Sequence, residues 1–350
     1  MAIKPIKFFK EKKSWSLAKD KILSWYLVPY LSKVKNLRKH IVIVDGFAGT
    51  GIYEDGSEGS PLIICKTIEN LKSKGVRATA VLIDYDKVCY SELKKNIKEF
   101  ETKEIALPFL GDFNSLTQKI VSATKDCPTF FYIDPFGIKG IEFENLKLIF
   151  EKVNKISTEI LINFNYKALL REYKINTILT NKVMGGDYYR EILEDDKMSD
   201  LDKEEKIIEM YKGKYREFFE YVGSFPVMYK DEQMAKYYLI FATSNFDGFK
   251  LMNDGMGKIY REFYSAGRLF QFLPSNKRDE QFLEKWILEL LKNKSINRGK
   301  IKEISIKKYF LCFMESDYNQ IINKLLKEEK IYSDTGKIRI NDDNLLAVSS

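Results

Sequence analysis

Histidine and cysteine are scarce in this sequence of 350 residues. His40 is the single histidine, which excludes a histidine-rich metal centre and disfavours Ser-His-Asp or Cys-His catalysis. The four cysteines include no Cys-x-x-Cys pair, so we expect neither a structural zinc site nor a disulfide framework. The chemistry must therefore depend on carboxylates, amides, aromatic rings, lysines or a bound cofactor, with no metal.

Long apolar runs are absent as well. No run approaches the ~20 apolar residues that a membrane-spanning helix needs, and the N-terminus lacks the apolar core of a secretory signal. We therefore expect a cytoplasmic protein with no membrane partner. Apolar residues make up 45% of the chain, which indicates a globular protein with a sizeable core, and the length allows two domains.

The net charge of +8 is unevenly distributed. Residues 1–40 contain eleven Lys and Arg against Glu11 and Asp20, a net of +9, so the remaining residues sum to about −1. Such a basic extension is a candidate contact for a polyanion, most simply nucleic acid, RNA or DNA. A solvated lysine-rich helix is the alternative, and the pattern at 14–36 indicates an amphipathic helix that Pro29 kinks or interrupts.

Short β-branched runs alternate with helical stretches from residue 41 onward. This pattern predicts an α/β fold, a doubly wound, Rossmann-like parallel sheet, within a domain over 41–260. A helical insertion at about 166–220 and an antiparallel strand pair at Phe225–Tyr229 and Tyr237–Thr243 complete the domain, before a short helix at 246–259. The parallel strands are expected at Ile41–Val44, Ala78–Ile83, Ile105–Leu110, Thr129–Ile133 and Glu159–Asn163, with helices at about 60–74, 87–100, 114–123 and 142–153.

Residues 277–350 form a separate module in this interpretation. Helices are expected at 279–292, around 305–313 and at Ser316–Glu328, with Ser316 as the N-cap of the third. A hairpin should follow, turning at Asp334-Thr-Gly336, and three helices before a hairpin is the order of a winged helix-turn-helix. The net charge of +3 leaves a nucleic-acid contact and a protein contact both open. Candidate contacts are Asn319, Asn323, Lys324, Lys327, Lys337 and Arg339.

The strongest chemical signal is the string that follows the first expected strand. Its glycines let the backbone pass close to a ligand at the carboxyl end of that strand, where open α/β sheets bind their ligands. A Gly-x-Gly-x-x-Gly dinucleotide fingerprint is absent, and a structural glycine turn is the alternative to a ligand site. The candidate cofactor-binding residues here are Asp45, Gly46, Phe47, Ala48, Gly49 and Gly51.

Two further strand ends carry acids. Asp84 ends the second strand, where a carboxylate can accept both ribose hydroxyls of a nucleoside, and Asp86 is its rival. Asp112 and Phe113 follow the third strand, where the acid can accept the adenine amino group while the ring packs on adenine. A helix N-cap role for Asp112, or for Asn114, is the competing interpretation.

Asp134-Pro135-Phe136-Gly137 ends the fourth strand and forms the candidate catalytic motif. An exocyclic amine can be methylated when its N–H groups are accepted, so that the nitrogen lone pair faces the methyl donor. A carboxylate and the next carbonyl supply the acceptors, proline fixes the turn, and an aromatic ring stacks on an extruded base. A strand-end turn without a catalytic role is the alternative.

Aromatic and amide side chains near the strand ends are further candidates. The group Asn163-Phe-Asn-Tyr166, after the fifth strand, is a candidate substrate contact. Core or rim packing is the alternative for the aromatic members. A base pocket lined by aromatic rings would draw on Tyr26, Tyr30, Phe136, Phe164 and Tyr166.

These motifs, in this order, resemble class I S-adenosylmethionine-dependent methyltransferases over about residues 40–165. Phe47-Ala-Gly-Thr-Gly51 is similar to the loop of enzymes that methylate amino groups in DNA and rRNA. The motif at 134–137 departs from their Asp-Pro-Pro-Tyr/Phe and is closer to the Asp-Pro-Phe/Tyr-Gly of tRNA guanine-N2 dimethyltransferases. The resemblance implies S-adenosyl-L-methionine as cofactor and a Rossmann-like fold.

A narrower resemblance, to the three-Cys-motif partner (TcmP) family, covers more of the chain. It is carried by Trp25–Leu31, Val44–Tyr53, Gly59-Ser-Pro61, Ile133–Gly137 and Gly248–Met256. The resemblance implies a methyltransferase-like domain before a winged-helix region, and a gene that lies beside one for a protein with a three-cysteine motif.

Three functions follow from these observations. The leading hypothesis is a methyltransferase that acts on an exocyclic amino group of a nucleic-acid base. The alternative is a non-catalytic adaptor that binds nucleic acid or a neighbouring gene product, the three-Cys-motif protein. Methylation of a protein or small molecule is the third.

Overall fold

A computed structural model describes residues 14–152, 157–228, 235–263 and 280–349. The chain divides into two compact units, 1–245 and 246–350. Parts of the expected basic extension (1–13), of the helix at 142–153 (Val153), of the strand ending at Tyr229 and of the C-terminal module (277–279) lie outside the described residues. Within the described ranges, no helix has the length and apolarity to cross a membrane.

The first unit is built on a seven-stranded sheet with the order β3-β2-β1-β4-β5-β7-β6. Strands β1 to β5 pair in parallel, and β7 pairs antiparallel with both β5 and β6. This arrangement confirms the expected Rossmann-like α/β fold. The strands are β1 (Ile41–Asp45), β2 (Ala78–Asp84), β3 (Ala106–Leu110), β4 (Thr129–Ile133), β5 (Thr158–Phe164), β6 (Tyr221–Met228) and β7 (Ala235–Thr243).

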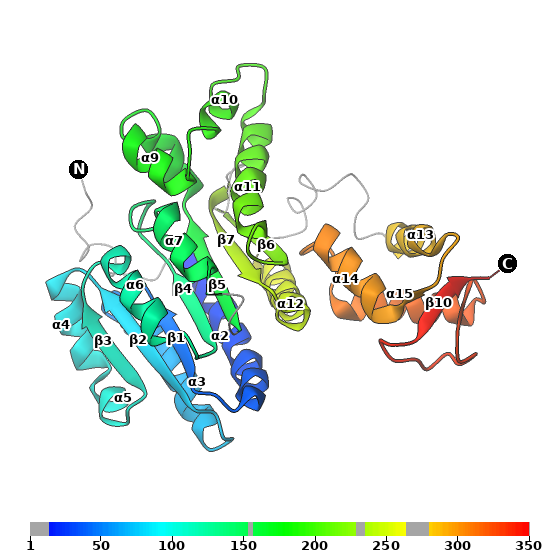
Figure 1. The fold of residues 1–350 in the computed structure, drawn as a ribbon, viewed down its shortest axis with the longest axis horizontal. Coiled ribbons are helices and arrows are strands. Elements are labelled where there is room, and N and C mark those ends of the chain that lie inside the picture. The colour runs from blue at the N-terminus through cyan, green and yellow to red at the C-terminus, as the bar shows by residue number, and fades with distance from the viewer. Residues whose placement is uncertain (1–13, 153–156, 229–234, 264–279, 350) are drawn as a thin grey trace. The chain divides into compact units, whose positions relative to one another are not determined.

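Helices cover both faces of this sheet, with α2 and α3 on one face and α6 and α7 on the other (Figure 1). Pro29 lies inside α2, so it does not interrupt the helix, which was one of the two effects expected of it. The helices are α2 (Ser14–Val34), η1 (Lys35–Leu37), α3 (Ser60–Lys72), α4 (Lys87–Asn96), α5 (Lys98–Thr102), α6 (Phe113–Ala123), α7 (Phe143–Phe150), α8 (Tyr166–Glu172), α9 (Thr177–Met184), α10 (Tyr189–Leu193) and α11 (Asp200–Arg216).

Helix α2 is anchored to the sheet by a buried polar contact. The Tyr26 hydroxyl donates to Glu159 Oε2 at 2.5 Å, and Thr243 Oγ1 donates to Glu159 Oε1 at 3.0 Å. Burial raises the pKa of the Glu159 carboxyl to about 7, and the hydrogen bonds from Tyr26 and Thr243 oppose this shift. Tyr26 and Tyr30 also pack against Phe130. Both tyrosines are core residues, which is the role that stood as the alternative to lining a base pocket.

The second unit contains four helices and a small antiparallel sheet of order β8-β10-β9 among its described residues. Its first helix contacts the rest of the unit through a hydrogen bond from Asn253 to the carbonyl of Phe313. The unit begins at Phe246, earlier than the expected module at 277–350. Its elements are α12 (Phe246–Phe263), α13 (Glu280–Leu291), β8 (Ile296–Asn297), α14 (Arg298–Lys308), α15 (Glu315–Lys327), β9 (Ile331–Ser333) and β10 (Leu345–Val348).

Three local expectations for this unit are wrong. The middle helix occupies 298–308 instead of 305–313, because Asn297 caps it by accepting from the Lys300 N–H. The third helix begins at Glu315, with the Asp317 carboxylate accepting from the Met314 N–H, so Ser316 is not its N-cap. The strand at 331–333 pairs with β10 and not with the residues directly after the turn.

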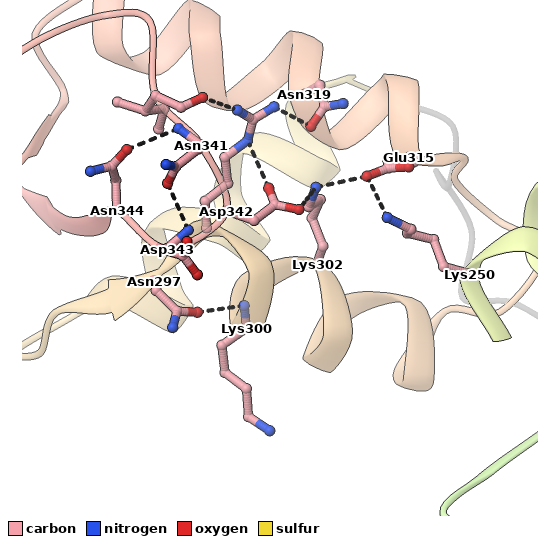
Figure 2. A network of polar contacts seen from close by, with 12 residues as sticks. Lys250, Asn297, Lys300, Lys302, Glu315, Asn319, Asn341, Asp342, Asp343 and Asn344 are labelled. Carbon is pink, nitrogen blue, oxygen red and sulfur yellow. Dashed lines mark hydrogen bonds and ion pairs between the residues drawn. The ribbon is translucent and has the colours of Figure 1, made fainter. Parts of the chain in front are cut away.

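A polar network explains why the segment after β9 does not form the expected hairpin (Figure 2). Lys302, only 2% exposed, donates to Glu315 at 2.8 Å and to Asp342 at 2.6 Å. Arg298 donates to the carbonyl of Ile340 at 2.6 Å and also contacts Asn319. These cations hold the chain around residue 342 against α14, so pairing resumes only at β10.

Candidate functional site

The glycine turn after β1 joins the carboxyl ends of three neighbouring strands. The Gly46 N–H donates to the carbonyl of Tyr132 on β4 at 3.0 Å, and the Ala48 N–H donates to the carbonyl of Ile83 on β2 at 2.8 Å. Gly49 and Gly51 have φ values of 63° and 79°, a conformation that favours glycine. The strand order reverses between β1 and β4, so the turn lies where such sheets bind ligands.

Gly46 is in close contact with an aromatic ring. A Cβ at this position would lie 2.9 Å from Cδ2 of Phe113, whose side chain is 2% exposed. The Phe113 ring also packs against Phe47, with centroids 5.7 Å apart. Phe113 therefore supports the glycine turn from within the core, and its ring is not open for the adenine stacking that its position suggested.

Asp45 is fully buried at the end of β1. Its carboxylate accepts from the Phe47 N–H at 3.1 Å and from the Ser60 hydroxyl at 2.6 Å. Burial raises the pKa of the Asp45 carboxyl to about 7; these two hydrogen bonds lower it, while the charges of Asp134 and Asp84 add to the rise. Asp45 thus ties the turn to the first residue of α3.

Asp84, at the end of β2, holds the turn from the other side. Its Oδ2 accepts from the Gly49 N–H at 2.8 Å and its Oδ1 accepts from the Asp86 N–H at 2.8 Å. Burial raises the pKa of the Asp84 carboxyl, and the bonds from Asp86 and Gly49 oppose this. Asp86 instead caps α4, accepting from the N–H groups of Val88 and Cys89. Of the two rival acids, Asp84 is the one at the turn.

Asp112 acts as the N-cap of α6. Its Oδ2 accepts from both the backbone N–H and the hydroxyl of Ser115 at 3.1 Å. The neighbouring Asn114 donates to Glu142, which precedes α7. The capping role that competed with the adenine contact is therefore present, and a carboxylate has further lone pairs that this cap does not use.

Asp134, just beyond β4, collects donors from three separate elements. Lys19 on α2 donates to Oδ2 at 2.5 Å, and Asn163 on β5 donates to Oδ1 at 2.7 Å. The Tyr132 hydroxyl lies 3.3 Å from Oδ2. The Lys19 and Asp134 side chains are 9% and 19% exposed, so this is a largely desolvated ion pair. The ammonium of Lys19 also lies 5.1 Å from the centroid of the Tyr237 ring.

The rest of the motif after β4 includes one exposed aromatic ring. Pro135 is buried, Phe136 is 49% exposed, and a Cβ added at Gly137 would meet no atom within 4 Å. Gly140, with a φ of 93°, approaches Phe47 so closely that a Cβ would lie 2.8 Å from the ring. The segment after β4 and the glycine turn therefore contact each other directly.

Two more of the candidate base-pocket rings pack in the core, the alternative role for these aromatic residues. Phe164 is fully buried and stacks on Tyr211 with ring centroids 4.4 Å apart, and Tyr166 is 1% exposed. Only Phe136 among the expected base-pocket rings is exposed. Asn163 does reach the site, whereas Lys19 was missed because no local pattern around it marks a partner 115 positions away.

These residues together suit a cationic nucleoside. The two hydrogen bonds that Asp84 accepts leave lone pairs, since a carboxylate offers about four acceptor sites. The missing side chains at Gly46 and Gly51 make room for Phe113 and Leu93, which fix the path of the turn along the carboxyl edge of the sheet. Asn163 Oδ1 is buried without a partner atom, directly beside Asp134. Such an acceptor can take a hydrogen bond from a donor that enters the site.

No model of a protein family matches this sequence, and no curated protein matches it. Solved structures do show similarity. Protein LPL1258 from Legionella pneumophila is 12% identical with a TM-score of 0.41, over 73% of this chain and 96% of that chain. SMU.1697c from Streptococcus mutans, solved in complex with SAH, is 10% identical with a TM-score of 0.35, over 69% and 99%. Spermidine synthase in complex with AdoDATO is 11% identical with a TM-score of 0.37, over 73% and 67%.

All three TM-scores lie below 0.5, so these likenesses carry no conclusion about ligand or substrate. The fold follows from the strand order itself: a mixed α/β unit with a large parallel sheet that resembles the Rossmann-like methyltransferase fold. None of the comparisons matches the three-Cys-motif partner family, so membership in that family stays a prediction.

Proposed function

We propose that the protein is an S-adenosylmethionine-dependent methyltransferase that acts on an exocyclic amino group of a nucleic-acid base. The observation that carries the proposal is the arrangement at the carboxyl edge of the sheet. A glycine turn tied to β2 and β4 lies next to a carboxylate, Asp134, that accepts hydrogen bonds from an amine and an amide.

The cofactor would be held by residues around the turn. Asp84 has lone pairs for the ribose hydroxyls, and Asp112 adds a second carboxylate. The backbone of Gly46–Gly51 would contact the nucleoside, and Asp45 would hold this turn in place through Phe47 and Ser60. S-adenosylmethionine, when bound, supplies an electrophilic methyl group. The positive charge of its sulfonium is complementary to this group of carboxylates.

Asp134 and its neighbours would hold the substrate amine. Its carboxylate accepts N–H bonds, so the lone pair of the amine is directed away from the protein and towards the methyl donor. Phe136 is the exposed ring on which an extruded base can stack. Strong general-base catalysis is unnecessary, because the amine can lose its proton after the methyl group is transferred, which suits a site without histidine.

Nucleic acid as substrate is supported by the basic extension and by the second unit. The +9 charge of residues 1–40 attracts a polyanion. The element order α13, β8, α14, α15, β9, β10 is that of a winged helix, and we propose that assignment for residues 280–349. On α15, Asn319 contacts Arg298 and Lys324 contacts Glu284. The exposed side chains that remain candidate contacts are Lys327 at the end of α15, and Lys337 and Arg339 after β9.

The test is methyl transfer from labelled cofactor to total RNA and to total DNA. We expect label in one of them with the wild-type chain, and loss of transfer with retained cofactor binding in Asp134→Ala. Label in neither nucleic acid would contradict the proposal.

The adaptor function, with a three-Cys-motif protein or nucleic acid as partner, keeps one specific observation in its favour. The carboxylates of Asp45, Asp84 and Asp134 all accept hydrogen bonds from within the protein. An adaptor would retain this arrangement for stability alone. It predicts that binding to a partner is unaffected by Asp134→Ala.

A further inference from the structure

Lys19 occupies the acceptor that the proposed reaction needs. Its ammonium donates to Asp134 Oδ2 at 2.5 Å and is largely shielded from water, with 9% of the side chain exposed. A substrate amine held by Asp134 requires an oxygen at the same hydrogen-bonding distance. Oδ2 has two lone pairs, and the Lys19 ammonium and the Tyr132 hydroxyl are both directed at it, so a substrate nitrogen can bond Oδ2 only by taking the place of one of them.

Of the three donors to Asp134, Lys19 is the one that can leave. Tyr132 lies on β4 and Asn163 on β5, and both are buried within the sheet at 1% and 4% exposure. Their hydroxyl and amide are fixed by the strands. Lys19 instead reaches Asp134 from α2 on a flexible four-carbon stem, so its ammonium can swing aside without disturbing the sheet.

The chemistry around the ammonium is that of an amine site. The carboxylate of Asp134 lies on one side and the face of the Tyr237 ring lies 5.1 Å away, a combination that attracts cations and N–H donors. The unpartnered Oδ1 of Asn163 adds a second buried acceptor beside it. A neutral exocyclic amine has two N–H groups, enough to satisfy both Asp134 and Asn163.

We propose that Lys19 is an internal substitute for the substrate amine, which closes the Asp134 site in the free protein and is displaced by a base that carries an exocyclic amino group. The inference rests on the proposed function in assigning the substrate amine to Asp134. It adds that the Lys19 ammonium must be displaced before the substrate amine can bind Asp134, and we call this displaceable ion pair the gate. Bases with a carbonyl in place of the amine have no N–H at that atom to exchange for the ammonium, so the gate also selects among bases.

The first test measures acetylation of Lys19 in the full chain by mass spectrometry after exposure to N-hydroxysuccinimidyl acetate. Lys21, exposed on the same helix, is the matched control. We expect Lys19 to react slower than Lys21 by about tenfold or more, because a desolvated ion pair resists opening. In Asp134→Asn the difference should disappear. Equal rates for the two lysines in the wild-type chain would overturn the proposal.

The second test adds nucleosides that differ at the exocyclic amine. Cytidine is compared with uridine, and adenosine and guanosine with inosine, because these small probes lack phosphates that could shield a released lysine. At least one amino nucleoside should speed Lys19 acetylation several-fold, and uridine and inosine should not. No acceleration by any of them, or equal acceleration by both classes, would overturn the proposal.

Kinetics of methyl transfer supply a third readout. Lys19→Met should lower the KM for substrate several-fold with little change in kcat, while Lys21→Met should match the wild-type chain. A fall in kcat that Lys19→Arg restores would mean that Lys19 orients Asp134, and would overturn the gate. The acetylation tests need no methyl transfer, so a protein that shows gated Lys19 but labels no nucleic acid would refute the proposed function and leave the amine site standing.

Discussion

Adding one methyl group at Gly46 should destabilise the first unit. The new Cβ would lie 2.9, 3.1 and 3.2 Å from three atoms of the Phe113 ring, closer than ordinary van der Waals contact. The ring cannot withdraw, because it is 2% exposed and packs against Phe47. The backbone is also held, since the Gly46 N–H donates to Tyr132. Overpacking of this kind costs about 1–3 kcal/mol, and each kcal/mol lowers Tm by about 2–4 °C in a domain of this size.

Thermal unfolding followed by circular dichroism measures this effect, and Gly137→Ala is the matched control. A Cβ at Gly137 would meet no atom within 4 Å, so its stability should change by less than about 0.5 kcal/mol. In the double variant Gly46→Ala/Phe113→Leu, the smaller side chain relieves the contact, so the two changes should cost less together than the sum of each alone. Equal stability of Gly46→Ala and Gly137→Ala would refute the reasoning.

Three other perturbations test separate parts of the structure. Burial raises the pKa of Asp45 to about 7, so between about pH 4 and pH 7 the carboxyl binds a proton on folding, and the free energy of unfolding falls as pH rises through this window, by up to about 4 kcal/mol. Asp45→Asn should reduce this pH dependence in urea unfolding, and an unchanged slope would be evidence against the burial effect. Lys302→Met removes the buried cation that joins Glu315 to Asp342, while Lys250 and Arg298 still contact these two partly exposed carboxylates, so it should cost about 1–3 kcal/mol in urea unfolding. The exposed Lys300→Met should cost under about 0.5 kcal/mol, and equal costs would contradict this. Asp134→Asn keeps the shape but loses the charge, so methyl transfer should fall by about 10²–10³-fold, and full activity in the labelled-methyl assay would exclude its proposed role.

The central sheet could be predicted from the sequence because its signals are local. The strand at Thr129–Ile133 was predicted with the bounds that the structure has, and the others within a few residues. Buried parallel strands are short apolar runs between helices, and each run carries its own pattern. The antiparallel pair at the end of the sheet was also found, although β6 begins at Tyr221 and not at Phe225.

The site could be predicted only in part, because several of its contacts join residues far apart in the chain. The strand ends at Asp45, Asp84 and Asp134 were identified from their place after apolar runs. The ion pair between Lys19 and Asp134 has no local signature, since Lys19 is one of eleven basic residues in the first forty. The burial of Phe113 also depends on packing against Gly46, which no pattern in either segment predicts.

The wrong predictions for the hairpin and the third helix of the C-terminal module also arise because tertiary contacts override local sequence signals. Asp334-Thr-Gly336 is a strong turn signal, so the residues directly after it were expected to pair. The structure places Asp342 on Lys302 instead, and this tertiary contact delays pairing until Leu345. Ser316 is a good N-cap by type, but the helix begins one residue before it.

Calorimetric titration of S-adenosylmethionine into the purified, folded full chain tests the central claim most directly. We expect one site per chain, with affinity retained in Asp134→Ala and lost in Gly46→Ala, because only the second change disturbs the turn. No binding to the wild-type chain would contradict the assignment of the glycine turn as a cofactor site, and with it the methyltransferase function.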